Sequence, residues 1–192
     1  DTAKALFLNA WNEATTAALD ALAVDAAHML AIVTEGDEQN AWNQRALELA
    51  ERSTEPRARR WRGSLYNNIG WSHFGKQDYE RALDCFEHAL ACRHEQSDAK
   101  LIRSARWCVA RVYRALDRTP EALDMLKSIL AEIEDSGAAQ DGFVYEELAE
   151  SHFALGRSEE ARSWFAKAYE TLSQDTGFVA NEPTRLRRIK TL

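Results

Sequence analysis

Residues 65–93 read LYNNIGWSHFGKQDYERALDCFEHALACR, and this stretch decides the fold. Its apolar and small side chains recur at intervals of three and four residues, which is the spacing of one helix face. Gly75 and Lys76 interrupt the pattern near its middle, where glycine favours the turn that ends a helix. The stretch therefore predicts two helices joined by a short turn.

The same arrangement returns along the rest of the chain. Small residues that occupy the equivalent place in four first helices are 39, 40 and 39 residues apart: Ala31, Gly70, Ala110 and Ala149. A constant period of this size is typical of stacked repeats, each of which buries its apolar face on its neighbours. The period predicts four helix-turn-helix repeats, over about residues 19–56, 57–97, 98–138 and 139–174.

Composition agrees with an all-α protein. Of the 192 residues, 45% are apolar, 29% are charged and only three are proline, which excludes a disordered or collagen-like chain. The apolar residues follow helical spacing almost throughout. We therefore expect a single domain over residues 1–192, with a leading helix at residues 2–13 and a closing helix at residues 182–190.

The residues that carry the repeat resemble the tetratricopeptide repeat: Ile69, Gly70, Gly75, Tyr79, Ala82, Phe86, Ala89 and Leu90. The period is longer than usual, and in this respect the chain is similar to kinesin light chains and to many bacterial proteins with such repeats. The resemblance implies a right-handed superhelical solenoid. It also implies that the first helices line a concave groove, where this superfamily usually holds an extended peptide or a helix of a partner.

Side chains suited to such a groove lie on the first helix of the second repeat. Asn67, Trp71 and Phe74 follow one another at intervals of four and three residues, and therefore share a helix face. The resemblance implies that Asn68 binds the backbone of a bound peptide, because a side-chain amide offers a donor and an acceptor together. The other three repeats have Met29, Cys108 and Glu147 at this position, so no ladder of asparagines is expected.

The first helix of the third repeat carries a stripe of arginine and tryptophan. Arg103, Trp107, Arg111 and Arg114 fall within an arc of about 80°, opposite the apolar face. Two interpretations are open. The arginines could bind the carboxylates of a ligand, or they could pair with acidic side chains of the next repeat, such as Glu146 and Glu150. The paired acids Glu146 and Glu147 are otherwise expected to be surface charge.

Charge is segregated along the chain. The net charge is -7, which argues against a general nucleic-acid binder, but residues 57–118 contain 13 Lys and Arg against 7 Asp and Glu. Residues 119–160 contain 2 Lys and Arg against 11 Asp and Glu. The basic middle predicts an acidic protein or peptide as the partner. The basic clusters at residues 57–62 and 185–190 lack the aromatic alternation of a single-strand binder.

No catalytic or metal-binding motif is present. Cys85, His88 and Cys92 share one helix face, but their spacing matches no finger or ribbon pattern. The three cysteines form no CxxC and cannot all pair with one another, which fits a reducing compartment. We therefore expect no enzyme activity, no metal and no cofactor.

The sequence thus predicts a non-enzymatic module that binds an acidic or extended peptide segment of a partner protein. The candidate contact residues are Asn67, Asn68, Trp71, Phe74, Arg103, Trp107, Arg111 and Arg114. The alternatives are a scaffold segment or self-associating solenoid, and an adaptor for nucleic acid. No apolar stretch approaches the roughly 18 residues of a membrane span, and no signal-like segment opens the chain, so a cytoplasmic location is expected.

Overall fold

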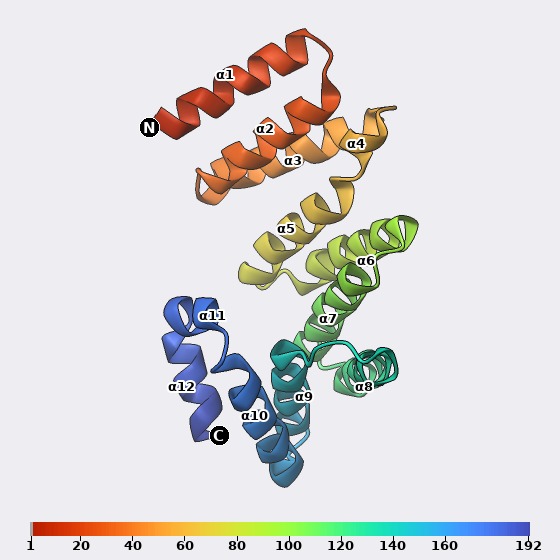
Figure 1. The fold of residues 1–192 in the computed structure, drawn as a ribbon, viewed down its shortest axis with the longest axis vertical. Coiled ribbons are helices and arrows are strands. Elements are labelled where there is room, and N and C mark those ends of the chain that lie inside the picture. Colours follow the sequence, from red (N-terminus) through yellow and green to blue (C-terminus); the bar gives the residue numbers. More distant parts are fainter. Residues whose placement is uncertain (1) are drawn as a thin grey trace. The chain divides into compact units, whose positions relative to one another are not determined.

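The protein is helical throughout the part that the structure describes. The computed structural model covers residues 2–192, in which no strand forms (Figure 1). This confirms the all-α prediction. The helices are α1 (Thr2–Thr16), α2 (Asp20–Ile32), α3 (Gly36–Arg52), α4 (Pro56–Arg59), α5 (Arg62–Gly75), α6 (Tyr79–Gln96), α7 (Ala99–Ala115), α8 (Thr119–Ser136), α9 (Gly142–Ala154), α10 (Ser158–Leu172), α11 (Thr176–Asn181) and α12 (Pro183–Thr191).

Four helix pairs occupy the four predicted repeats: α2 with α3, α5 with α6, α7 with α8, and α9 with α10. The predicted leading and closing helices correspond to α1 and α12. The short helices α4 and α11 were not predicted. None of the helices within residues 2–192 combines the length and apolar character that crossing a membrane requires.

The helices gather into two compact units, Asp1–Ala105 (unit 1) and Arg106–Leu192 (unit 2), whose boundary falls inside α7. In unit 1, α2 packs on α1 and α3, and α5 packs on α3 and α6. In unit 2, α9 packs on α8 and α10, and α12 packs on α10. A single domain over the whole chain and a right-handed superhelical path remain predictions.

A left-handed residue closes the turn inside the later repeats. Gln77, Asp117 and Gly156 have φ angles of 60°, 59° and 71°. The residue after each returns its N–H to a carbonyl five positions earlier: Asp78 to His73 at 3.0 Å, and Arg118 to Tyr113 at 2.8 Å. These bonds satisfy carbonyls that the end of a helix leaves without a partner. The turn therefore depends on Gln77 rather than on the conformational freedom of Gly75.

Small residues let the two helices of a repeat approach each other. A Cβ atom at Gly70 would lie 2.8 Å from the ring of Phe86, which is fully buried. The same relation recurs in unit 2, where a Cβ at Gly142 would lie 2.6 Å from Leu172. Close packing of this kind fixes α5, which carries part of the candidate site, against α6.

Candidate functional site

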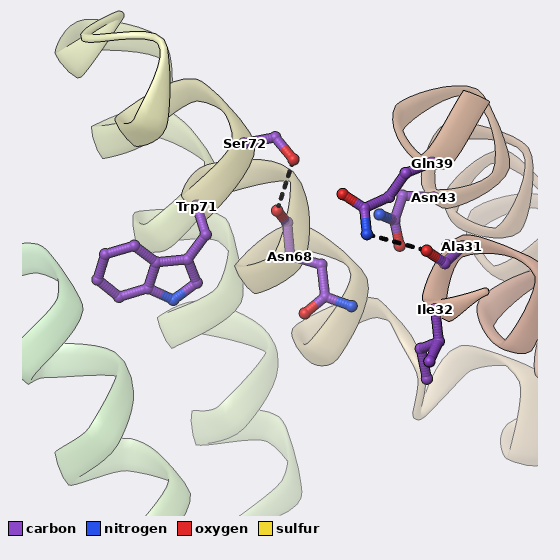
Figure 2. A pocket seen from close by; sticks show the side chains of 7 residues that line it. All are labelled: Ala31, Ile32, Gln39, Asn43, Asn68, Trp71 and Ser72. Carbon is purple, nitrogen blue, oxygen red and sulfur yellow. Dashed lines mark hydrogen bonds between the residues drawn. The ribbon is translucent and has the colours of Figure 1, made fainter. Parts of the chain in front are cut away.

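A pocket of about 400 Å³ opens between α5 and the pair formed by α2 and α3. Figure 2 shows Asn68 and Trp71 on the α5 side, with Gln39 and Asn43 of α3 opposite them. The remaining lining residues are Ala31, Ile32 and Ser72. All seven side chains are uncharged, so the pocket combines an apolar surface with carboxamide groups.

Asn43 is the unusual member of this set. Asn43 is only 3% exposed, yet its side-chain oxygen Oδ1 has no hydrogen-bond partner within residues 2–192. A buried polar atom without a partner costs about 1–3 kcal/mol, so such atoms are uncommon unless a ligand or water supplies the bond. Asn43 therefore contributes an enclosed carboxamide oxygen without a partner to the wall of the pocket.

Sequence reasoning missed Asn43, although a signal was available. Trp42, Ala46, Leu47 and Ala50 are buried on α3, and Asn43 precedes Ala46, Leu47 and Ala50 by three, four and seven residues. It therefore occupies a core-facing position of the helix. A polar side chain at such a position is informative, because a buried amide is rarely used without a hydrogen-bonding purpose.

The core holds Trp71 in place. Its ring meets the rings of Phe86 and Phe74 edge to face, at centroid distances of 5.0 Å and 5.3 Å. Phe74 in turn lies 5.2 Å from Tyr79, across the turn of the same repeat. The structure thus brings Asn68 and Trp71 together at the pocket. Asn67 and Phe74 lie on the same helix but do not line the pocket.

In unit 2 the arginine stripe faces a carboxylate of the chain itself. Arg114 donates a hydrogen bond to Glu147, and Nη1 of Arg111 lies 3.7 Å from the other oxygen of that carboxylate. The indole N–H of Trp107 donates to the carbonyl of Phe143 at 3.0 Å, and the Arg111 guanidinium lies 5.5 Å from the Trp107 ring centroid. Internal pairing, one of the two open interpretations, therefore describes Arg111 and Arg114 in this structure.

The acidic pair on α9 differs from the sequence expectation. Glu146 and Glu147 are buried, and Glu147 is only 1% exposed, so their assignment as surface charge is wrong. Arginines from two elements neutralise them: those of α7 reach Glu147, while Arg185 of α12 binds Glu146 through two bonds of 2.7 Å. Hydrogen bonding to Glu147 raises the pKa of Arg114, although burial opposes its charge.

Arg103 differs from the other stripe arginines. It lies near the start of α7, within unit 1, and it is half-buried. It makes no ion pair with any Asp or Glu of residues 2–192, whereas Arg106, its neighbour by one turn, binds Glu132. Its guanidinium is therefore the member of the stripe that no carboxylate of the described chain neutralises.

The cysteines have the character of packing residues. Cys85, Cys92 and Cys108 are buried and form no disulfide among residues 2–192, and burial raises the pKa of Cys85 to about 11 and that of Cys108 to about 12. A thiol that stays protonated is a poor nucleophile and a poor metal ligand. The described chain contains no group of three or more His, Cys, Asp or Glu residues placed to hold a metal ion.

Two of the repeats match models of a known protein family. Residues 63–94 match one family model of the tetratricopeptide repeat, and residues 144–171 match a second. These segments contain the α5–α6 turn with the Asn68 side of the pocket, and most of the α9–α10 pair. No curated protein sequence matches the chain.

Solved structures resemble the chain at low sequence identity. BtubC (BKLC) from P. vanneervenii has a TM-score of 0.69 and 17% identity, covering 88% of this chain and 72% of that one. A Podosopora anserina chain with nearly identical TPR-like repeats has a TM-score of 0.57 and 18% identity, covering 80% of this chain and 76% of that one. MamA of AMB-1 has a TM-score of 0.52 and 20% identity, covering 87% and 90%. At these identities the similarity is one of fold.

Proposed function

Because the chain is a tetratricopeptide-repeat protein, built on a fold that generally mediates protein–protein interaction, we propose that it binds an extended segment of a partner protein in the pocket between α3 and α5. Asn68 and Asn43 hydrogen-bond the peptide backbone, and Trp71 supplies contact area beside them. No catalytic step is part of this function. The observation that carries the proposal is the buried Asn43 side-chain oxygen without a partner, on a pocket that Asn68 also lines.

The chemistry of an extended peptide fits these groups. Each residue of an extended backbone offers an N–H donor and a C=O acceptor, and a carboxamide satisfies one of each. The Asn43 oxygen is enclosed and lacks a partner, and a turn of its side chain toward the pocket would let a bound N–H supply one. Trp71 is packed against Phe86 and Phe74, so little conformational freedom is lost when a ligand contacts it.

We further propose that the bound segment of the partner protein is acidic. Residues 57–118 carry 13 Lys and Arg against 7 Asp and Glu, so they attract anions at long range. We assign the first carboxylate contact to Arg103. Trp107, Arg111 and Arg114 lie in unit 2 and are separate candidate contacts, and a carboxylate that binds Arg111 or Arg114 must compete with Glu147.

The backbone-binding role predicts a large loss of affinity when either carboxamide is removed. We expect Asn68→Ala and Asn43→Ala each to weaken binding of a peptide selected from an acidic library by about tenfold, since a net hydrogen bond is worth about 1 kcal/mol and an orphaned partner costs more. Fluorescence anisotropy with a labelled peptide measures this. Asn12→Ala, an exposed asparagine on α1, is the matched control and leaves affinity unchanged. Equal affinity of wild type and both pocket variants would contradict the site.

The acidic preference is tested at Arg103 rather than at Arg111 and Arg114. Glutamate at either of the latter positions would stand beside the buried Glu147 and destabilise unit 2 by repulsion, so loss of binding would be ambiguous. Arg103→Glu disturbs no ion pair among residues 2–192. We expect it to weaken an acidic peptide by about fivefold at low salt, and less at high salt. An effect of the same size on a neutral peptide would show that charge is not what Arg103 contributes.

A further inference from the structure

A second, apolar groove lies between α1 and α2, with a volume of about 480 Å³. Phe7 and Ala14 of α1 line it on one side, and Leu22 and Met29 of α2 line it on the other. Leu22 is 59% exposed and Leu19, which also lines the groove, is 48% exposed, so two large aliphatic side chains are accessible there. The groove shares no lining residue with the pocket that contains Asn68.

The ionisable residues that line this groove are both acidic. Glu13 and Asp25 are exposed, and neither forms an ion pair with a Lys or Arg of residues 2–192. His28 lies near Asp25, and burial lowers the pKa of His28 although Asp25 opposes the shift, so this ring is a weaker counter-charge for Asp25 than an ordinary histidine would be. Residues 1–56 as a whole contain 10 Asp and Glu against 3 Lys and Arg. The groove is therefore apolar at its base and negative at its rim.

Unit 2 contains a helix of the complementary kind. The helix α12 carries Arg185 and Arg188 on one face, and these bind Glu146 and Glu150 of α9. On the same helix, Ile189 is buried in the core beside Phe165. This chain thus stabilises a short helix by pairing its arginines with carboxylates of a first repeat helix while its aliphatic side chains pack beneath. In unit 1, the first repeat helix α2 leaves Asp25 and Leu22 exposed beside the groove, although most of its other apolar side chains are buried.

From this we infer that the groove between α1 and α2 binds an amphipathic helix of a partner protein, one that carries Lys or Arg beside large aliphatic side chains. The apolar face of that helix covers Leu22 and Met29, and its cations pair with Glu13 and Asp25. Burial of the exposed leucine supplies affinity, and the carboxylates select against acidic helices. The chain would then carry two peptide sites of opposite charge preference.

Two matched peptides test this inference. Both have about 14 residues, roughly four helical turns, with leucine at helical spacing; one has lysine and the other glutamate at the remaining positions. We expect the lysine peptide to bind the wild-type chain at least about tenfold more tightly than the glutamate peptide, measured by isothermal titration calorimetry at physiological salt. Leu22→Gln and the double variant Glu13→Lys, Asp25→Lys should each weaken the lysine peptide by about tenfold or more.

Control variants locate the site on the groove. Glu48→Lys reverses an exposed acidic residue of α3 outside the groove, and Leu155→Gln removes an exposed leucine of unit 2; both should bind as wild type does. The inference is overturned if both peptides bind alike, or if Glu48→Lys weakens binding as much as the groove variants do. It is also overturned if light scattering shows a dimer that Leu22→Gln dissociates, because a second copy of the chain would then be the occupant. Binding at the Asn68 pocket is measured with a different peptide, so the two sites succeed or fail separately.

Discussion

Glu147→Gln is expected to lower the free energy of unfolding of unit 2 by about 3 kcal/mol, because breaking a buried ion pair leaves its partners without a counter-charge. The carboxylate is buried, and Arg111 and Arg114 both converge on it. Glutamine keeps the shape but removes the charge, so two guanidinium groups then share a pocket without a neutralising carboxylate. The loss of stability follows from that charge imbalance rather than from a cavity.

Hydrogen exchange measures this effect in the unit concerned. Amides of residues 106–192 should exchange faster in Glu147→Gln, while those of the N-terminal helices stay as in the wild type. The matched control is Glu159→Gln, which removes an exposed carboxylate that pairs with Arg162 one turn along the same helix. Exposed pairs of this kind contribute little, so the control should change stability by less than about 0.5 kcal/mol. Equal exchange in the two variants would mean that the buried pair does not stabilise unit 2.

Phe86→Ala is expected to destabilise unit 1 by about 3–5 kcal/mol, the usual cost of deleting a buried aromatic side chain. Phe86 is fully buried, packs on Gly70 and supports the Trp71 ring at 5.0 Å. Its removal leaves a cavity that the close approach of α5 and α6 cannot fill. The same variant should weaken peptide binding even below its denaturation midpoint, since Trp71 loses the surface on which it rests.

Urea denaturation followed by circular dichroism measures the stability change. Phe153→Ala is the control, because Phe153 is 51% exposed on α9 and its removal opens no cavity; a change of less than about 1 kcal/mol is expected. If Phe86→Ala proved as stable as Phe153→Ala, close packing at Gly70 would not be what holds this repeat together.

Local patterns sufficed for the helices and for their pairing. Ala31, Gly70, Ala110 and Ala149 each hold the same place in their repeat. The contacts within one repeat join residues that are close in sequence, so the sequence pattern reveals them. Of the helix face predicted from spacing, Asn67, Trp71 and Phe74, only Trp71 lines the pocket, and Asn68, which the family resemblance suggested, lies beside it. A face of a single helix can be assigned from sequence because its period is known.

The pairing of charges could not be assigned in this way. The helical angles group Arg103, Arg111 and Arg114 together, but those angles say nothing about which carboxylates stand opposite. Two of these arginines bind Glu147, whereas Glu146 and Glu150, the acids considered from sequence, bind the closing helix α12 instead. A shift of one residue along α9 turns a carboxylate by about 100°, which is enough to change its partner.

The sequence by itself determined that this protein is a series of helix pairs, because amphipathic spacing and repeat period are properties of adjacent residues. Only the tertiary structure decided which polar groups are satisfied. Asn43 lacks a partner for its buried oxygen, Glu147 is buried between two arginines, and the carboxylates of Glu13 and Asp25 rim an apolar groove. Hydrogen bonds and ion pairs join residues that are far apart in sequence, and their geometry exists only once the helices have packed.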